Sequence, residues 1–420
     1  MGTTLKKLVD SKGLVTNNRS LFSMILFMGL SIKKLLLKDR NWLAYRQYYG
    51  DSLRDVEVSS INQVLSCRHY ARGHAHFICT NKPCMHENRV QFTCKNRACS
   101  SCGRAATDRW IEQQKVLLPP APWQHATLTM PSVLWPFFKS DRRLISEVTR
   151  IAGKLFKKIA AKKGVTPGVF MAIHTFGRSM NWNVHIHASV TRGGLTKENT
   201  WRECYFKSKV LMKMWRYELI TLLRKRLNNG ELLIPGEYTN TNLYELLDKQ
   251  YKKYWRVHLA RPHKNPIKDI KYLGRYLKRP PIASSRLTHY NGSDVLFNFH
   301  NHKTKQTNYK RLDVFDFITR FIQHIPPKGF RMIRYSGFLS NRSRGKLLPI
   351  VNRIFNNNQV LRRITWQSMV KKTLGFDPLQ CILCKASLKF SGVVIGLSSK
   401  ELLQHQDIIA KMKPIKKRLG

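Results

Sequence analysis

The sequence predicts an α+β fold, and three features of the chain support this prediction. Apolar and polar residues alternate at 125–130 and 184–191, a pattern typical of half-buried strands. Segments of helical character separate and follow these strands, and no unit of about twenty to fifty residues repeats as it would in a solenoid. A block rich in cysteine and histidine, 41–115, has few long apolar runs and is typical of a small domain that folds around a metal.

The composition indicates a polyanionic partner. Among 420 residues the chain has 75 lysines and arginines against 24 aspartates and glutamates, which gives a formal net charge of +51. Because 42% of the residues are hydrophobic, the chain can form folded cores, and a disordered basic tail protein is excluded. The basic residues run through the whole length of the chain, so we expect an extended cationic groove for nucleic acid. So few acidic residues also argue against a catalytic triad of carboxylates.

Residues 1–40 form an N-terminal extension whose apolar stretch, 21–32, is too short to span a bilayer. We interpret this stretch as a packed helix and expect no membrane partner. Nine cysteines make an odd number, and six of them lie between Cys67 and Cys102. This distribution favours metal binding over a disulfide framework, and with it a cytoplasmic location.

Turn and capping residues separate the elements that follow the cysteine-rich block. Ser140 is the expected N-cap of a helix that stops at Gly164, and two consecutive glycines, Gly193 and Gly194, close a strand pair. The predicted elements are a proline-rich linker at 117–123, a strand at 125–130, a helix at 141–163, strands at 169–176 and 184–191, a helix at 201–227, and mixed strands and helices at 286–420.

The spacing of the cysteines is typical of structural zinc sites. Cys99-x2-Cys102 has the spacing of a zinc knuckle, and Cys79-x4-Cys84 fits its opposite half, so these four thiolates are predicted to close one tetrahedral site. Two more cysteines and four histidines remain as candidate ligands of a second zinc ion, and the spacing does not assign them. They are Cys67, Cys94, His69, His74, His76 and His86. Towards the C-terminus, Cys381-x2-Cys384 is either half a knuckle or a lone pair of thiols.

Two histidines share the polar face of one predicted strand. In the segment 184–191, alternation places His185 and His187 opposite the apolar face. The strand at 125–130 places His125 on its own polar face in the same way. If the two strands are neighbours in one antiparallel sheet, His125 completes a three-ligand site with open positions for substrate oxygens.

Two tyrosines share one face of a predicted helix, which begins at Asn265-Pro266 and stops at Pro280-Pro281. At roughly 100° per residue, Tyr272 and Tyr276 lie about 130° away from the apolar stripe. An isolated pair at this spacing usually packs ring on ring. Beside a metal site in so basic a chain, however, a tyrosine hydroxyl can attack a DNA phosphate and form a covalent ester.

Five segments, taken in order, resemble the rolling-circle insertion-sequence transposases, which are HUH endonucleases with two tyrosines. The resemblance covers roughly residues 60–350. The segments are TCKNRACSSCG, LPPAPWQHATLTMP, HTFG followed by NWNVHIHASVTRGGL, YLGRYLKRPP, and RMIRYSGFLSNRSRGKLLP. The sequence departs from the family pattern at Asn183 and Val184, where His-Pro is expected before the first metal histidine, and at Cys79-x4-Cys84, where two intervening residues are expected.

The resemblance implies a fold and a domain order. The fold is a palm-like antiparallel sheet with helices on one face, which forms an HUH nuclease domain. A small zinc-binding domain that recognises DNA precedes it, and a basic α/β C-terminal region follows it. The expected boundaries are 1–40 for the extension, 41–115 for the zinc-binding domain, 116–285 for the nuclease domain and 286–420 for the C-terminal region.

The resemblance also implies a chemistry. His185 and His187 correspond to the paired histidines that bind a divalent metal, Mg²⁺ or Mn²⁺, and Tyr272 and Tyr276 to the two nucleophiles. The role of His125 as third ligand is our own hypothesis. The implied reaction cleaves single-stranded DNA at the ends of the element, leaving a 5′-phosphotyrosine and a free 3′-hydroxyl, and then transfers the strand to target DNA.

Two alternatives and one further partner follow from the same residues. A replication initiator or relaxase would use the same chemistry, whereas a zinc-dependent DNA-binding protein would use none of it. The sequence contains no GxxxxGK[ST] motif, so strand separation is expected to come from a host helicase or the replication machinery, at the nucleoid in the cytoplasm.

Overall fold

The structure is a computed structural model of the chain, and it describes residues 30–236, 238–264, 266–277, 279–301, 304–358, 364–402 and 404. The side chains at 275–277 and 374 lie outside this description. So does most of the apolar stretch predicted as a packed helix at 21–32. Within the described residues, no helix combines the length and the apolar character that are needed to cross a bilayer.

A six-stranded sheet lies at the centre of the molecule, and all its strand pairs are antiparallel. Its order is β11-β4-β5-β3-β7, with β6 paired to β5. The long strand β5 lies between β3 and β4, which confirms that the two predicted histidine-bearing strands are neighbours. The strands are β3 (Trp123–Thr129), β4 (Thr166–Phe176), β5 (Trp182–Leu195), β6 (Trp201–Glu203), β7 (Val257–Leu259) and β11 (Ile333–Gly337).

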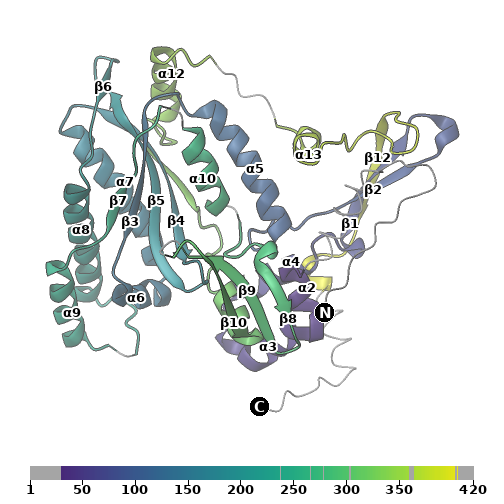
Figure 1. Ribbon diagram of the computed structural model, residues 1–420, viewed down its shortest axis with the longest axis horizontal. Coiled ribbons are helices and arrows are strands. Elements are labelled where there is room, and N and C mark those ends of the chain that lie inside the picture. The colour runs from purple at the N-terminus through teal and green to yellow at the C-terminus, as the bar shows by residue number, and fades with distance from the viewer. Residues whose placement is uncertain are drawn as a thin grey trace, which may run out of the picture.

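Helices cover both faces of this sheet (Figure 1). On one face, the apolar side of β5 packs with α7 and α8, and Val184 and Ile186 are fully buried there. On the other face, Phe170 and Ala172 of β4 pack against α5 and α10. The expectation of helices on one face only is therefore wrong, because β4 is apolar on both sides. The helices are α6 (Trp135–Ser140), α7 (Arg143–Ala161), α8 (Ser208–Asn228), α9 (Asn240–Lys252), α5 (Ser100–Leu117), α10 (Ile267–Leu277) and α12 (Arg344–Ile354).

The helix predicted at 201–227 begins only at Ser208, because Trp201–Glu203 form β6 and residues 204–207 connect this strand to the helix. This short strand pairs with the end of β5 at Gly193 and Gly194. A Cβ on Gly193 would lie 2.6 Å from the indole nitrogen of Trp201. The glycines therefore allow the tryptophan to close over the hairpin.

The N-terminal helices share a core with residues from beyond the expected boundary at 285. Trp42 and Tyr45 pack with Phe317 and Phe321, and the Tyr45 hydroxyl lies 2.7 Å from Thr319 Oγ1. The expected boundaries at 40 and 285 do not separate packing units, because helices and strands from both ends bury their apolar faces on each other. The elements are α2 (Ile32–Leu37), α3 (Asn41–Tyr49), α4 (Asp55–Leu65), β8 (Leu287–Tyr290), β9 (Asp294–His300), β10 (Thr307–Asp313) and α11 (Val314–Ile322).

A third unit projects from the body of the molecule as an arm (Figure 1). It is a three-stranded antiparallel sheet of order β12-β1-β2. The arm joins the N-terminal cysteine-rich block to the C-terminal region, with α13 beside it (Figure 1). The elements are β1 (Gly73–Cys79), β2 (Glu87–Gln91), β12 (Leu388–Ile395) and α13 (Trp366–Leu374).

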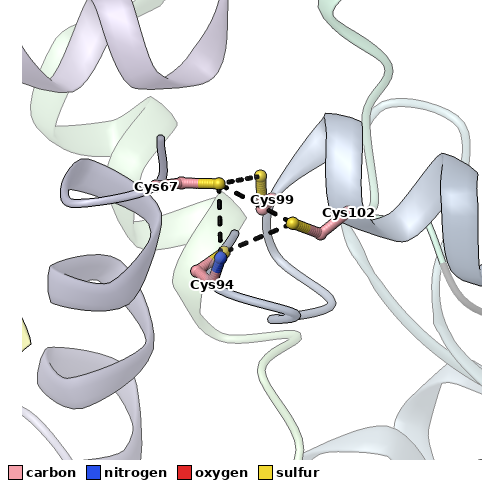
Figure 2. A group of neighbouring side chains, drawn as sticks. All are labelled: Cys67, Cys94, Cys99 and Cys102. Atoms are coloured by element: carbon pink, nitrogen blue, oxygen red, sulfur yellow. Dashed lines mark hydrogen bonds between the residues drawn. The ribbon is translucent and has the colours of Figure 1, made fainter. Parts of the chain in front are cut away.

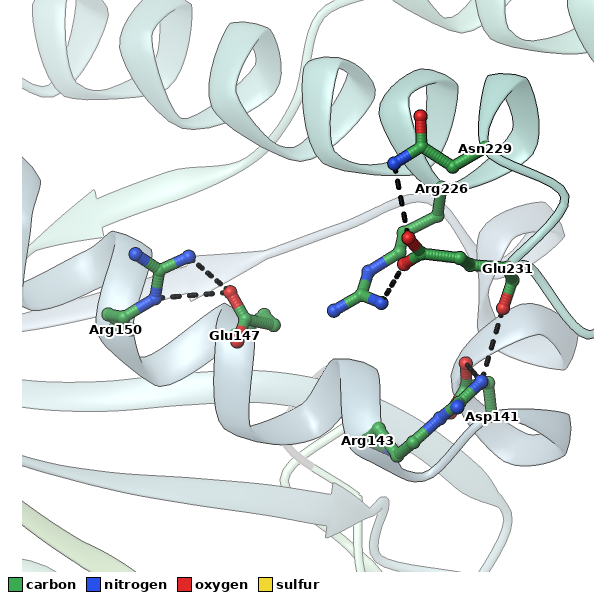
Figure 3. Close-up of polar contacts among 7 residues, drawn as sticks. All are labelled: Asp141, Arg143, Glu147, Arg150, Arg226, Asn229 and Glu231. Carbon is green, nitrogen blue, oxygen red and sulfur yellow. Dashed lines mark hydrogen bonds and ion pairs between the residues drawn. The ribbon is translucent and has the colours of Figure 1, made fainter.

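Polar contacts fix the start of α7 against the end of α8 (Figure 3). Arg143 donates to both carboxylate oxygens of Asp141 at 2.8 Å, and its guanidinium also donates to the carbonyl oxygen of Glu231 at 3.1 Å. The Glu231 carboxylate accepts hydrogen bonds from Arg226 and Asn229. The hydrogen bonds from Arg143 hold the pKa of Asp141 below its usual value.

Asp141→Ala should lower the free energy of unfolding by about 2 kcal/mol, because the buried carboxylate accepts several charge-assisted hydrogen bonds. Since its pKa is depressed in the folded state, this stabilisation is present above about pH 4 and is lost as the pH falls below that value. Glu147→Ala is the matched control: Glu147 is 24% exposed where Asp141 is 2% exposed, and ion pairs of more exposed carboxylates contribute less than about 1 kcal/mol. Denaturant titrations of both variants measure the difference, and equal losses would contradict the prediction.

Candidate active site

Three histidines converge on the face of the central sheet that α10 covers. The predicted alternation in β5 is confirmed: Val184 and Ile186 enter the core on one face, and His185 and His187 lie on the other. Directly opposite His185 on β4 lies His174, and residues opposite each other in an antiparallel pair share one face. One ring nitrogen from each of these histidines lies within 4.8 Å of the others.

The histidine that joins this group is His174, whereas His125 was expected. His125 lies opposite Ser189, two pairs along the ladder from His187, which lies opposite Thr127. From there His125 Nε2 approaches His187 Nδ1 at 3.1 Å, so that His125 contacts a candidate ligand. The pairing of β4 with β5 therefore places His174 beside His185. The available signal was the presence of a histidine, His174, near the end of the otherwise apolar predicted strand 169–176.

Burial keeps the three rings in the state that a metal ligand needs. It lowers the pKa of His174 and of His187 well below the ordinary value, and it also lowers the pKa of His185. The rings are therefore neutral at neutral pH. His185 Nδ1 donates to the carbonyl oxygen of Asn183 at 2.9 Å, which leaves the lone pair on Nε2.

Helix α10 brings Tyr272 to this group. The Tyr272 ring meets the rings of His125 and His187 edge to face, with centroid distances of 5.1 and 5.6 Å. Because Tyr272 is 40% exposed, a substrate can reach it. Tyr276 lies one turn further along α10, and its side chain is outside the described part of the structure, as is the predicted cap Asn265.

Apolar contacts hold α10 at a fixed distance from its neighbours. Ile270 and Leu273 are fully buried against β4 and α5. A Cβ on Gly274 would lie 2.7 Å from the Ile111 side chain, so glycine at this position allows α10 and α5 to approach closely.

A buried carboxylate, which sequence reasoning missed, joins α10 to the sheet. Asp269 is 4% exposed, and its Oδ2 accepts a hydrogen bond from Ser189 Oγ at 2.5 Å. Its other oxygen lies 2.9 Å from His263 Nε2. Asp269 precedes Tyr272 by three residues and therefore lies on nearly the same side of the helix. The available signal for Asp269 in the sequence was an acidic residue, rare in this chain, on the side of the predicted helix that carries Tyr272.

Four cysteines form the first zinc group, next to the shared core of α4 and α5 (Figure 2). Their sulfur atoms lie 3.6 to 3.7 Å apart where hydrogen-bond contacts join them. A tetrahedral ion with Zn–S bonds of about 2.3 Å needs sulfurs about 3.8 Å apart, so the donor set fits Zn²⁺. A closed set of four ligands is structural rather than catalytic. The four residues are Cys67, Cys94, Cys99 and Cys102.

The cysteines do not group as their spacing suggested. Cys99 and Cys102, at the start of α5, share their group with Cys67 and Cys94, because α4 and the loop after β2 reach them. The expected partners of the knuckle join the C-terminal pair instead, in a second group of Cys79, Cys84, Cys381 and Cys384. Among the described histidines of the block, none joins either group.

Comparisons with known proteins identify the family. A family model described as a putative transposase matches residues 168–346, and one described as a transposase zinc-binding domain matches residues 37–130. The transposase for insertion sequence element IS801 of Pseudomonas savastanoi pv. phaseolicola is 36% identical over 395 residues, which cover 92% of this chain and 95% of that protein. The chain belongs to the rolling-circle insertion-sequence transposases with an N-terminal zinc-binding domain.

The transposase has a second relative, and the matched regions cover the site. The putative transposase y4qJ of Sinorhizobium fredii (strain NBRC 101917 / NGR234) is 27% identical over 320 residues, which cover 73% of this chain and 79% of that protein. No solved structure matches the transposase. The region 168–346 contains the three histidines and both tyrosines, whereas Cys381 and Cys384 lie outside both matched regions.

Proposed function

We propose that this transposase cleaves single-stranded DNA at the ends of its element and transfers the strand to target DNA through a 5′-phosphotyrosine. The observation that carries the proposal is the contact of Tyr272 with His125 and His187, beside the converging His174 and His185. The palm-like HUH nuclease fold implied by the sequence resemblance belongs to the same proposal.

The three histidines fit a divalent cation. His174, His185 and His187 would hold it, and when bound it would act as a Lewis acid on the scissile phosphate. Mg²⁺ demands oxygen ligands in a near-ideal octahedron, and Mn²⁺ accepts imidazole nitrogen more readily than Mg²⁺ does, so of the two expected cations Mn²⁺ fits this donor set better. His125, in contact with His187 Nδ1, would orient that ring instead of binding the ion.

Tyr272 is the proposed first nucleophile. Its hydroxyl oxygen forms a bond to phosphorus while the bond from phosphorus to the 3′ oxygen breaks, so the 5′ end stays on the protein and the 3′ end leaves as a hydroxyl. Tyr276 lies four residues on, on the same side of α10, and is proposed as the second nucleophile for the partner strand. A second covalent link would let one site hold donor and target strands in turn.

A groove that is lined by Phe176, a neighbour of His174, offers a path for the DNA strand. It encloses about 880 Å³ and is lined by Lys95, Arg97, Lys328 and the ring of Phe176. Phe176 stacks on His174 with a centroid distance of 5.5 Å, and Lys95 directly follows Cys94 of the first zinc group, so the groove is lined by neighbours of both groups. Cations that follow a backbone and aromatic rings that stack on bases are the usual elements of single-strand binding.

The double variant Lys95→Ala, Lys328→Ala should weaken the binding of single-stranded DNA and make it less dependent on salt. Each lost phosphate contact removes about 0.7 from the slope of log affinity against log salt concentration. Lys213→Ala, on the exposed side of α8, is the matched control. Fluorescence anisotropy at several salt concentrations measures the slopes, and an unchanged slope in the double variant would place the strand elsewhere.

The ends of the cleaved DNA test the proposed chemistry. Wild-type protein with Mn²⁺ and single-stranded DNA that carries the element's ends should give a 3′ end that a polymerase extends and a 5′ end blocked by protein. A replication initiator or relaxase would give the same ends, and transfer to a second strand separates the transposase from them. Binding without any cleavage would favour a zinc-dependent DNA-binding protein. Strand separation by a host helicase or the replication machinery, in the cytoplasm at the nucleoid, is part of this proposal.

A further inference from the structure

The arm brings together two pairs of cysteines from opposite ends of the chain. Cys79 ends β1, and Cys84 ends the 3₁₀ turn Lys82–Cys84. Cys381 and Cys384 lie in the turn before β12, and one sulfur from each of the four residues lies within 4.8 Å of the others. The sulfurs of Cys79 and Cys384 are 3.4 Å apart, and those of Cys84 and Cys381 are 3.7 Å apart.

We propose that these four cysteines bind a second structural Zn²⁺, which fastens the C-terminal segment to the N-terminal zinc-binding domain. The sulfur distances are close to the tetrahedral edge of about 3.8 Å and far from a disulfide bond of about 2.05 Å. The first group likewise consists of four cysteines, and its sulfur–sulfur distances are similar. The chain then carries two zinc ions. The ligands of the second come from both ends of the chain: Cys79 and Cys384 are 305 positions apart in the sequence, and Cys84 and Cys381 are 297 positions apart.

The backbone has the same conformation at both groups. The residue after one cysteine of each pair in the arm is left-handed, Met85 with φ 49° and Lys385 with φ 63°. In the first group, Arg68 and Lys95 follow Cys67 and Cys94 with φ 55° and 54°. A left-handed conformation is unfavourable for a residue other than glycine, because its Cβ crowds the following carbonyl oxygen. Four cysteines in two separate groups are followed by a residue in this unfavourable conformation. We infer that the tight turns at these positions serve to bring the thiolates together around a metal.

Strand pairing makes the C-terminal segment part of the zinc-binding domain. β12 pairs with β1 from Gly73 opposite Ile395 to Cys79 opposite Leu388, and β1 lies between β12 and β2 (Figure 1). A Cβ on Gly73 would lie 2.1 Å from the carbonyl oxygen of Val394, so this glycine is needed for β12 to approach. Without β12 the arm would be an isolated hairpin, which is marginally stable in water.

Contacts continue past the end of the strand. The backbone N–H of Leu397 donates to the carbonyl of Ala71 at 2.6 Å, and Arg72 donates to Ser399 Oγ at 2.5 Å. The second zinc lies at one end of this paired segment and these hydrogen bonds lie at the other. The segment is therefore held at both ends, and only the zinc end depends on metal.

The two zinc sites differ in exposure, which predicts the order in which they lose metal. All four cysteines of the first group are buried, between 5% and 8% exposed, in the core shared by α4 and α5. In the arm, Cys79, Cys84 and Cys384 are only partly buried. A chelator should therefore remove the arm zinc first and release the C-terminal segment, while the first site keeps its ion.

Metal content tests the proposal on the full-length protein purified under reducing conditions. Elemental analysis should find two zinc ions per chain in the wild type and one in the double variant Cys381→Ser, Cys384→Ser. Cys204→Ala is the matched control, because this buried thiol belongs to neither group, and it should keep both ions. A single zinc in the wild type, or no difference between wild type and double variant, would overturn the proposal.

Chelation of the wild-type protein gives a second test that does not depend on how the variant folds. One zinc should leave at least ten times faster than the other, and trypsin should then cleave at Lys385 or Lys389 while the rest of the chain stays intact. Loss of both ions together, or loss of one ion without new cleavage in the C-terminal segment, would contradict the proposed fastening. A disulfide between Cys79 and Cys384 in the reduced preparation would also contradict the proposed zinc site.

Discussion

Replacing His174 with Ala should lower the rate of DNA cleavage by at least about 1,000-fold, which corresponds to about 4 kcal/mol of transition-state stabilisation. His174 is one of three imidazoles whose nitrogens converge within 4.8 Å, and burial keeps its ring neutral. His125→Ala should cost only about 10- to 100-fold, because His125 contacts His187 Nδ1 and acts by orienting that ring.

Cleavage of a labelled single strand in Mn²⁺, followed over time, measures these rates. Mn²⁺ affinity measured on the same variants should fall most for His174→Ala. The exposed His289 of β8, which lies in a different sheet, supplies the control variant His289→Ala with unchanged rates. If His125→Ala loses more activity and more Mn²⁺ affinity than His174→Ala, the third ligand is His125 and the assignment from the structure is wrong.

Asp269→Ala should lower the rate of covalent attachment by about 100-fold without changing the metal content, because a displacement of the nucleophile by about 1 Å costs that much. Asp269 is a positioning residue. It touches neither the phosphate nor the metal group in our account, and acts by joining α10 to Ser189 of β5 and to His263. Asp269→Asn keeps an oxygen that accepts the Ser189 hydrogen bond and should recover part of the rate.

A double-mutant cycle separates positioning from a general loss of stability. If Asp269 acts through Ser189, the variant with both residues changed to Ala should be slowed no more than Asp269→Ala alone. Thermal unfolding of each variant shows whether the fold is intact at the assay temperature. A rate for Asp269→Ala equal to that of the wild type, with the hydrogen bond removed, would mean that the apolar contacts of Ile270 and Leu273 position Tyr272 by themselves.

Local patterns predicted the parts of the site that lie on single elements. Alternation assigned His185 and His187 to one face of β5, and helical periodicity placed Tyr272 away from the apolar stripe of α10. Such patterns depend only on the geometry of one strand or one helix. They carry no information on the register between strands. They therefore could not show whether His174 or His125 lies beside His185 and His187.

Pairings between distant segments could not be predicted from spacing. Cys79 and Cys84 have a knuckle nearby in the sequence at Cys99, yet they meet Cys381 and Cys384, because β12 pairs with β1. Asp269 was missed for the same reason, since its partners Ser189 and His263 come together only when α10 packs on the sheet.

The core that the two ends of the chain share could not be predicted from the sequence either. Trp42 and Phe317 lie in segments that the sequence assigns to different domains, and each segment has an apolar face that its own residues do not cover. Composition shows that such faces exist, but only the fold shows which of them meet.

Mass spectrometry of the covalent adduct tests the central claim most directly. Wild-type protein, single-stranded DNA with the element's ends and Mn²⁺ should give a nucleotide attached to the peptide that contains Tyr272 or Tyr276. The double variant Tyr272→Phe, Tyr276→Phe should bind the same DNA and form no adduct. An adduct that persists in the double variant, or a folded and zinc-loaded wild type that binds the DNA and never links to it, would contradict the account.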